Sequence, residues 1–297
     1  MTRSGAELRG RVALHAYRAV AWLGRTLPEH TGRLLFRWFG LLAHAVAPGV
    51  RATVAANQAQ VLGRPVDDPL VRASTRDAFV SYARYWFDSF HAVRIPFDEL
   101  LDRFECVGIE NMQDALAAGT GVIMALPHIG NWDVAARWLD ALGIDPVAVA
   151  EQLDPPELFD LFVRHREALG MRVIGLSSEG VGHKLRQAIA ENHLIALVAD
   201  RDLTGRGVEV EMFGRTRKLP AGPALLSLAT GAPLVVAPVY QTEDAWRCVM
   251  YPPCTIEPSG NRRADVVALT EEMAAGFERA IAAAPSDWHV FQPAWEP

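Results

Sequence analysis

A histidine and an aspartate, His128 and Asp133, are separated by four residues in the stretch ALPHIGNWDVAARWL (125–139). The apolar residues before Pro127 predict a short strand, and the residues from Trp132 onward predict a helix. The histidine then protrudes from the end of a strand, and the aspartate lies in the first turn of a helix. A carboxylate on one imidazole nitrogen fixes the tautomer, while the other nitrogen can remove a proton from a hydroxyl group. The spacing therefore predicts a general base that works without a protein nucleophile.

The residues between this pair suit a tight turn. Gly130 permits a short loop, Asn131 can cap the helix, and Asp133 can then fold back towards His128. The same six residues are also compatible with a purely structural arrangement, in which a loop histidine is bonded to a helix-capping aspartate. The motif alone leaves both interpretations open.

Motifs for several other chemistries are missing or incomplete. The stretch GLSSEG (175–180) has a glutamate where a nucleophile elbow needs its second glycine. The chain contains no P-loop, no strand-linked GxGxxG and no HExxH motif. We therefore expect no metal ion, and a net charge of −6 gives no reason to expect a nucleic-acid partner. Buried thiols in a reducing compartment are expected for the three cysteines, Cys106, Cys248 and Cys254.

Strands and helices alternate from about residue 105 onward. Continuous apolar strands with short connections predict an α/β fold, a mixed central sheet with helices on both faces. Strands are expected at 121–126, 146–150, 172–176, 194–199, 208–213, 234–240 and 247–251. Helices are expected at 68–93, 132–142, 155–169, 179–191, 221–230 and 266–284.

Ligands of such sheets bind beyond the carboxyl ends of the strands. This rule selects the loops at 127–133, 151–154, 177–179 and 200–203. Asp202, or its neighbour Asp200, follows the strand at 194–199 and can support the imidazolium of His128 in place of Asp133. The structural alternative for either carboxylate is a cap on the turn after the strand.

The first 64 residues are basic although the chain as a whole is acidic. They contain nine arginines, no lysine and only two acidic residues, a net charge of +7. Such an asymmetry predicts contact with an anionic surface. We expect one domain spanning 1–297, with a membrane-associating helical segment at 1–64 and a catalytic α/β core at 105–297.

Two amphipathic helices are expected within the basic segment. Arginines recur at seven-residue spacing in the first helix. The second helix, TGRLLFRWFGLLAHAVA (31–47), also has arginines among leucine, phenylalanine and tryptophan residues. In the first helix Arg11, Arg18 and Arg25 are expected on one face, with Trp22 among the apolar residues opposite. No stretch reaches the roughly 18–20 apolar residues of a membrane span. The helices either pack on their own core or lie in a membrane interface, and the charge asymmetry favours the membrane.

The residues around the motif resemble a known family. ALPHIGNWD (125–133) resembles the H-x4-D block of the lysophospholipid and glycerol-phosphate acyltransferases, and GNWD resembles the lauroyl/myristoyl lipid A branch. The stretches at 150–176, 194–214 and 219–240 are similar to the actinobacterial phosphatidylinositol mannoside acyltransferases. Pro127, where lipid A enzymes usually have asparagine, and the bulky Ile129 argue against lipid A as the acceptor.

This resemblance implies a glycerolipid-acyltransferase-like fold and a specific reaction. The implied reaction moves a palmitoyl group from acyl-CoA to a mannose hydroxyl of phosphatidylinositol mannoside, with acyl-CoA as co-substrate and no cofactor. His128 would deprotonate the hydroxyl, which attacks the thioester directly. The implied location is an anionic membrane surface on the cytoplasmic face, with peripheral attachment beside a hydrophobic channel. Another glycolipid acceptor, a thioesterase activity and a non-catalytic lipid-binding protein are the alternatives.

The resemblance also implies residues that contact the substrates. Glu151 falls in a block that contacts polar acceptor groups in similar enzymes, and Arg166 aligns with a family arginine that has Arg164 as its near neighbour. A solvated helix face is the structural alternative for both Glu151 and Arg166. Asp200 is also expected among the residues that contact the substrates. An arginine suits a phosphate or an oxyanion because it stays charged and donates two parallel hydrogen bonds. A cationic loop before a helix can hold phosphates of CoA or of inositol, or can be a solvated turn: Arg215, Arg217 and Lys218.

Overall fold

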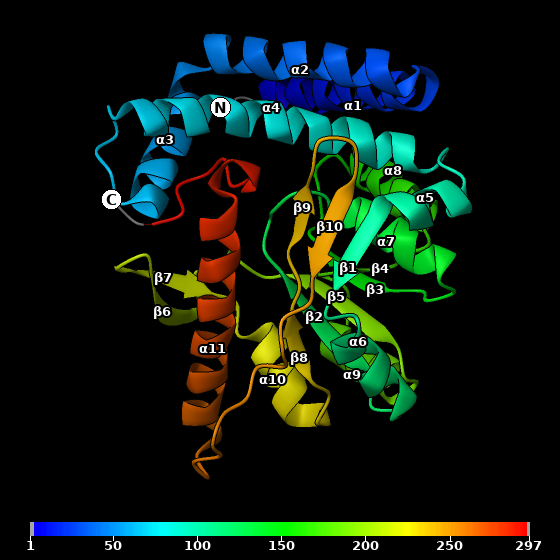
Figure 1. Cartoon of the computed structure of the whole chain (residues 1–297), viewed down its shortest axis with the longest axis vertical. Helices are drawn as coiled ribbons and strands as arrows, with labels where there is room; N and C mark the ends of the chain where they lie inside the picture. Colours follow the sequence, from blue (N-terminus) through cyan, green and yellow to red (C-terminus); the bar gives the residue numbers. More distant parts are fainter. Residues whose placement is uncertain (1–2, 296–297) are drawn as a thin grey trace.

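The structure is a computed structural model that describes residues 3–295 (Figure 1). The helices are α1 (Arg3–Thr26), α2 (Glu29–Val46), α3 (Pro48–Leu62), α4 (Pro69–Ala92), α5 (Phe97–Arg103), α6 (Glu110–Ala117), α7 (Trp132–Ala141), α8 (Pro156–Glu167), α9 (Val181–Ala190), α10 (Gly222–Thr230), α11 (Arg262–Ala283) and the 3-10 turn η1 (Pro285–Asp287). The strands are β1 (Phe104–Val107), β2 (Val122–Leu126), β3 (Val147–Ala150), β4 (Arg172–Gly175), β5 (Leu194–Val198), β6 (Val208–Met212), β7 (Arg215–Leu219), β8 (Leu234–Val236), β9 (Val239–Gln241) and β10 (Trp246–Val249).

The central sheet has five strands in the order β4-β3-β5-β2-β8, and every pair in it is parallel. The expectation of a mixed central sheet was therefore wrong. A helical crossover links consecutive strands of this sheet, and such connections produce parallel pairing. Antiparallel pairing occurs beside it, in the β6–β7 hairpin and in the small mixed sheet β1-β10-β9.

Pro238 divides the strand that was predicted at 234–240. The chain leaves the central sheet after β8 and enters the small sheet as β9. Proline has no backbone N–H and cannot continue a ladder within a sheet. The single apolar run is consequently shared between two sheets.

Both faces of the central sheet are covered. Successive side chains of β2 point to opposite faces, and each face packs into its own hydrophobic core. Ile123 and Ala125 face a core built with α9, α10 and α11, and Val122 and Met124 face a core built with α6 and α7. The residues of β2 itself are almost wholly buried. Because β2 is packed on both faces, its carboxyl end, which leads to His128, is held in a fixed position.

The amino-terminal helices form a layer in which α1, α2 and α4 lie side by side (Figure 1). Glycines allow the helices to approach closely: a Cβ on Gly32 would lie 2.0 Å from the Phe87 ring, and one on Gly40 would lie 2.6 Å from the backbone oxygen of Phe79. The layer joins the rest of the chain through α4, which contacts α7 and η1, and through α1, which contacts α8.

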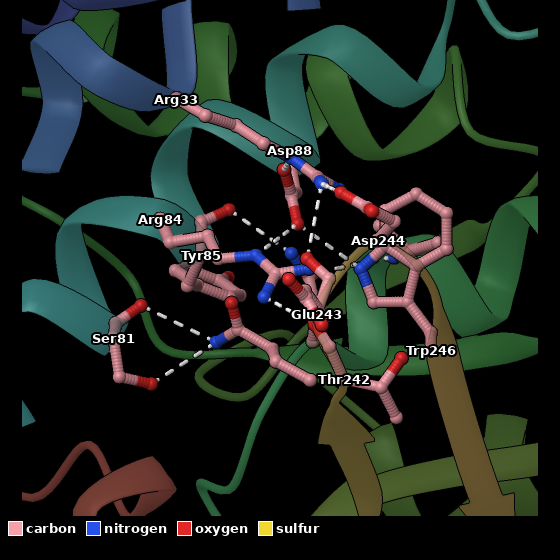
Figure 2. A network of polar contacts seen from close by, with 12 residues as sticks. Arg33, Ser81, Arg84, Tyr85, Asp88, Thr242, Glu243, Asp244 and Trp246 are labelled. Atoms are coloured by element: carbon pink, nitrogen blue, oxygen red, sulfur yellow. Dashed lines mark hydrogen bonds and ion pairs between the residues drawn. The ribbon is translucent and has the colours of Figure 1, made fainter. Parts of the chain in front are cut away.

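A buried carboxylate, Asp88 of α4, joins this helical layer to the small sheet (Figure 2). It accepts hydrogen bonds from Nε of Arg33 at 3.3 Å, Nε of Arg84 at 3.1 Å and Nε1 of Trp246 at 3.1 Å. The Arg33 guanidinium also reaches Asp244 in the β9–β10 turn. Two helices and one strand that are far apart in the sequence, α2, α4 and β10, thus meet at the Asp88 carboxylate.

The outer faces of α1 and α2 differ from the predicted pattern. Trp22 is exposed beside Arg18 instead of lying opposite the arginines, because residues four apart share a helix face. The outer face of α2 is apolar, with Leu34, Trp38 and Leu42 exposed. Within residues 3–295, no single helix has the length and hydropathy of a membrane span, and only the pair α2 and α3, bent by 98°, meets those criteria together.

Candidate active site

His128 and Asp200 meet beyond the carboxyl ends of two neighbouring strands. Leu126 is paired with Val198 in the parallel ladder of β2 and β5, so residues two positions beyond each strand lie next to each other. Nδ1 of His128 makes a short hydrogen bond to Oδ1 of Asp200. The backbone N–H of His128 donates to Oδ2 of the same carboxylate at 3.0 Å. The site is therefore built by strand register.

Asp200 is fully buried, whereas the His128 side chain keeps 23% of its surface exposed. Nε1 of Trp288 also donates to Oδ2 of Asp200 at 2.8 Å. Burial alone would raise the pKa of Asp200, but the charge and hydrogen bond of His128, the Trp288 bond and the Arg217 charge outweigh it and lower the pKa to about 2. The carboxylate is ionised at neutral pH and accepts a hydrogen bond from Nδ1 of His128, so the neutral tautomer that fits this contact has its lone pair on Nε2.

Arg217 supports this pair from inside the protein. Its guanidinium donates to the backbone oxygen of Asp200 at 2.5 Å and lies over the rings of Trp288 and Trp295. The expected role in holding a phosphate is wrong for this residue, because its position in β7 turns it into the core. Arg215 is exposed, and Nζ of Lys218 lies 3.4 Å from the backbone oxygen of Gly205.

Asp133 lies at the start of α7 but does not contact His128. Its Oδ2 accepts hydrogen bonds from the Tyr85 hydroxyl at 2.8 Å and from Oγ of Ser89 at 2.7 Å, and Oδ1 lies 3.4 Å from Nε of Arg166. Among the described residues, no hydrogen bond joins Asp133 to His128. The predicted fold-back is corrected by this geometry, since the first turn of α7 directs the carboxylate towards α4 and α8.

Asp133 is instead the end of a buried polar chain that reaches α1. Ser89 donates to Asp133 and accepts from Nε2 of His165 at 2.9 Å, while the Arg25 guanidinium donates to Nδ1 of His165 at 3.2 Å. Burial lowers the pKa of His165 to about 4, so the ring is neutral. Tyr85, Ser89 and His165 were not predicted as site residues from the sequence. The available signal was the four-residue spacing of Tyr85 and Ser89, which places them on one face of a helix.

Asp202 caps the loop after β5, as its structural alternative predicted. It accepts hydrogen bonds from the backbone N–H groups of Thr204 at 2.9 Å and Gly207 at 2.7 Å, and from the Thr204 hydroxyl. Within the described part of the chain it makes no hydrogen bond to His128. The structure thus places Asp200, and neither of the two other aspartates, against His128.

The expected substrate residues occupy different environments. Arg166 is buried, and its guanidinium lies 4.2 Å from the centre of the Phe162 ring, facing an internal cavity. Arg164, two residues earlier on α8, is exposed. Glu151 is exposed at the carboxyl end of β3. Of the two arginines, only Arg166 faces the interior of the site.

An apolar cavity lies between α7 and the central sheet. Leu126, Trp132 and Val198 line it at the carboxyl ends of the strands, and Phe104 and Trp138 line it farther inside. The ring of Trp132 lies 5.5 Å from the ring of His128. The cavity therefore starts beside His128, and its lining is almost wholly apolar.

Comparisons with known proteins extend over the whole chain. The sequence pattern of the family described as bacterial lipid A biosynthesis acyltransferase matches residues 7–296. The chain is 37% identical to a phosphatidylinositol mannoside acyltransferase of Mycolicibacterium smegmatis over 305 residues, covering 99% of this chain and 95% of the relative. It is 38% identical over 294 residues to phosphatidylinositol mannoside acyltransferases from two strains of Mycobacterium tuberculosis, covering 93% of this chain and 87% of each relative.

Proposed function

The chain is an acyltransferase that belongs to the bacterial lipid A biosynthesis acyltransferase family, and from this premise we propose that it moves a palmitoyl group from acyl-CoA to a mannose hydroxyl of phosphatidylinositol mannoside. The observation that carries this proposal is the pairing of His128 with the buried Asp200 at the start of an apolar cavity. The printed names of the similar proteins, which are 37–38% identical, support the acceptor.

In the proposed mechanism His128 acts directly on the acceptor. Nε2 removes the proton of the mannose hydroxyl while its oxygen attacks the thioester carbonyl carbon. The resulting imidazolium is stabilised by the ionised Asp200 at Nδ1. When the carbon–sulfur bond breaks, the CoA thiolate takes up the proton from His128. The base is then neutral again, and no acyl-enzyme forms.

The acyl chain of the donor is proposed to occupy the apolar cavity. Its methylene groups would contact Leu126 and Val198 near the thioester and Phe104 and Trp138 farther inside. Removing apolar surface from water supplies the binding free energy for such a chain. We propose that the acyl chain bound in this way is a palmitoyl group.

Polar groups of the substrates are proposed to bind at the surface around this cavity. Arg215 and Lys218, on the outside of β7, remain candidates for phosphates of CoA. Glu151 and Arg164 remain candidates for polar groups of the acceptor. Arg166, which lines the cavity, is the candidate for contact with the part of the substrate that lies inside it.

Peripheral binding to the cytoplasmic face of the cell membrane completes the proposal. Leu34, Trp38, Leu42 and Val46 recur every four residues along α2 and are 51–67% exposed. On α1, Arg18 and Trp22 are both exposed. An apolar helix face flanked by exposed arginines suits the boundary between anionic headgroups and acyl chains.

A panel of acceptors tests the proposed reaction. The purified protein is incubated with palmitoyl-CoA and either phosphatidylinositol mannoside, phosphatidylinositol or a lipid A precursor, and the lipids are analysed by mass. We expect one palmitoyl group on phosphatidylinositol mannoside only. Acylation of the lipid A precursor alone would assign another acceptor, and thioester cleavage that is equal with every lipid and without lipid would indicate a thioesterase.

A further inference from the structure

Trp132 holds a buried hydrogen-bond donor that has no acceptor. This residue begins α7, four positions after His128, and its Nε1–H is shielded from solvent with no partner among the described residues. Nearly all buried polar groups in folded proteins are paired, so an unpaired donor beside a reactive group needs a reason. A substrate atom that is present only during the reaction would supply the missing acceptor.

The indole is held in one position between the base and the cavity. Its ring lies 5.5 Å from the His128 ring at 84° and 4.6 Å from the Tyr85 ring at 33°. Tyr85 is itself fixed by its hydrogen bond to Asp133. The other side of Trp132 lines the apolar cavity. A donor held this firmly needs no reorganisation when charge develops next to it.

We propose that Nε1–H of Trp132 stabilises the oxyanion of the tetrahedral intermediate in acyl transfer. The inference rests on the proposed function. As the hydroxyl oxygen bonds to the thioester carbon, its proton moves to Nε2 of His128, and the carbonyl electron pair moves to the carbonyl oxygen. Trp132 donates to that negative oxygen. When the carbonyl reforms, the carbon–sulfur bond breaks, and the thiolate receives the proton from His128.

The location of the reacting carbon favours this assignment. The acyl chain runs into the cavity and the attacking oxygen lies at His128, so the carbonyl group must lie where cavity and base meet, which is the position of Trp132. Trp132 is also in the first turn of α7, where the helix dipole favours negative charge. Arg166 faces the same cavity, but its Nε lies 3.4 Å from the Asp133 carboxylate, which attracts its charge away from the site.

Removal of the N–H without a change of ring shape tests the proposal. Trp132 is replaced by 3-benzothienylalanine, in which sulfur takes the place of the indole N–H, and separately by phenylalanine. The matched control makes the same two replacements at Trp86 of α4, whose ring lies 5.2 Å from the Tyr85 ring but is not among the residues that line the cavity. For each variant we measure kcat and KM for palmitoyl-CoA, the hydrolysis of palmitoyl-CoA without acceptor, and the affinity for a palmityl-CoA thioether that has no carbonyl.

We expect both changes at Trp132 to lower kcat about 100-fold, while KM and thioether affinity stay within about twofold. The same changes at Trp86 should leave kcat near that of the wild type. A benzothienylalanine variant at position 132 with wild-type kcat would overturn the proposal, as would a loss of thioether affinity that accounts for the whole effect. Acceptor-free hydrolysis passes through the same oxyanion. If the wild type hydrolyses palmitoyl-CoA but acylates no phosphatidylinositol mannoside, the acceptor is wrong, and the hydrolysis rates still decide the role of Trp132.

Discussion

A carboxylate that solvent does not reach, Asp200, holds the His128 ring in place. Asp200 accepts hydrogen bonds from Nδ1 and the backbone N–H of His128 and from Nε1 of Trp288, while Arg217 holds its backbone oxygen. Every one of these contacts favours the ionised form or fixes its position. The orientation and the tautomer of His128 are consequently set before any substrate binds.

Asp200→Asn should lower kcat by about 10²–10⁴-fold, because the neutral amide cannot stabilise the imidazolium and can favour the wrong tautomer. The matched control is Asp202→Asn, two residues away, where the side chain only caps a loop. We expect the control to keep kcat within about threefold of the wild type. Steady-state kinetics with palmitoyl-CoA measure both, and a larger loss in the Asp202 variant than in the Asp200 variant would refute the assignment.

Two buried histidines should make folding stability depend on pH. Burial lowers the pKa of His165 to about 4 and is the main cause that lowers the pKa of His289 to about 3, from an ordinary value of 6.5. Their contribution is fully present above pH 6.5, where both states are neutral. This contribution is lost as the pH falls towards 4, because the histidines of the unfolded chain bind protons before those of the folded protein do. The free energy of unfolding then falls by up to about 1.4 kcal/mol per pH unit for each histidine.

Urea unfolding of wild type and variants between pH 7 and 5 measures this dependence. His165→Gln should lower the pH slope of the free energy of unfolding by close to the value for one proton, about 1.4 kcal/mol per pH unit, because one of the two buried histidines is removed. His15→Gln, at an exposed position of α1, should leave the slope unchanged. Equal slopes in wild type and His165→Gln would contradict the buried neutral ring.

At the scale of elements, the layer over the site depends on how closely α2 approaches α4. A Cβ on Gly40 would lie 2.6 Å from the backbone oxygen of Phe79 and 2.9 Å from Cα of Val80. Backbone atoms of a packed helix cannot move aside as a flexible side chain can. The approach is therefore possible only with glycine at this position.

Gly40→Ala should lower the free energy of unfolding by about 1–3 kcal/mol through overpacking. Gly49→Ala is the matched control, because its added methyl group meets no atom within 4 Å. The control should be neutral or stabilising by up to about 1 kcal/mol, as alanine restricts the unfolded chain. Denaturant unfolding decides between them, and equal stability of both variants would disprove the close contact.

The strands of the central sheet could be predicted closely from the sequence. The run predicted at 121–126 is β2, Val122–Leu126, and the run at 194–199 is β5, Leu194–Val198. Strands of a covered parallel sheet are continuous apolar segments, which is a strong local signal. His128 and the choice between Asp200 and Asp202 followed from the ends of these strands.

The partner of His128 could not be decided from the sequence. Asp133 is five residues away and Asp200 is 72 residues away, yet contact depends on strand register and on the direction of a side chain in the first turn of α7. The same holds for Arg217, which shares a face of β7 with the exposed Arg215 but is buried where its guanidinium lies over the Trp288 and Trp295 rings. The partner of His128 and the burial of Arg217 both depend on how distant segments pack together, and the spacing of residues along the sequence does not show that packing.

For the whole molecule, charge and apolar surface gather at the amino-terminal layer. The outer face of α2 is apolar, although it has no protein partner within the described chain, and exposed arginines flank it. Exposed apolar patches of this kind mark surfaces that contact another phase or partner. Within this layer α4 contacts α7, the helix that begins beside the candidate active site.

Leu42→Gln should weaken binding to vesicles that contain anionic lipid by about tenfold, because one leucine no longer enters the apolar region. The control is Leu225→Gln on α10, an exposed leucine outside the layer, which should bind as the wild type does. Flotation at low and high salt provides the measurement, and binding should weaken as salt screens the arginines. Binding to neutral vesicles that salt does not affect would contradict the role of the arginines.

The measurement that tests the account most directly is thiol release from palmitoyl-CoA by wild type and His128→Ala, with and without phosphatidylinositol mannoside. We predict release that requires the acceptor, yields one added palmitoyl group by mass, and falls by about 10²–10⁴-fold in the variant, with unchanged thermal stability. Acceptor-dependent release at the wild-type rate by His128→Ala would contradict the central claim that this histidine is the general base.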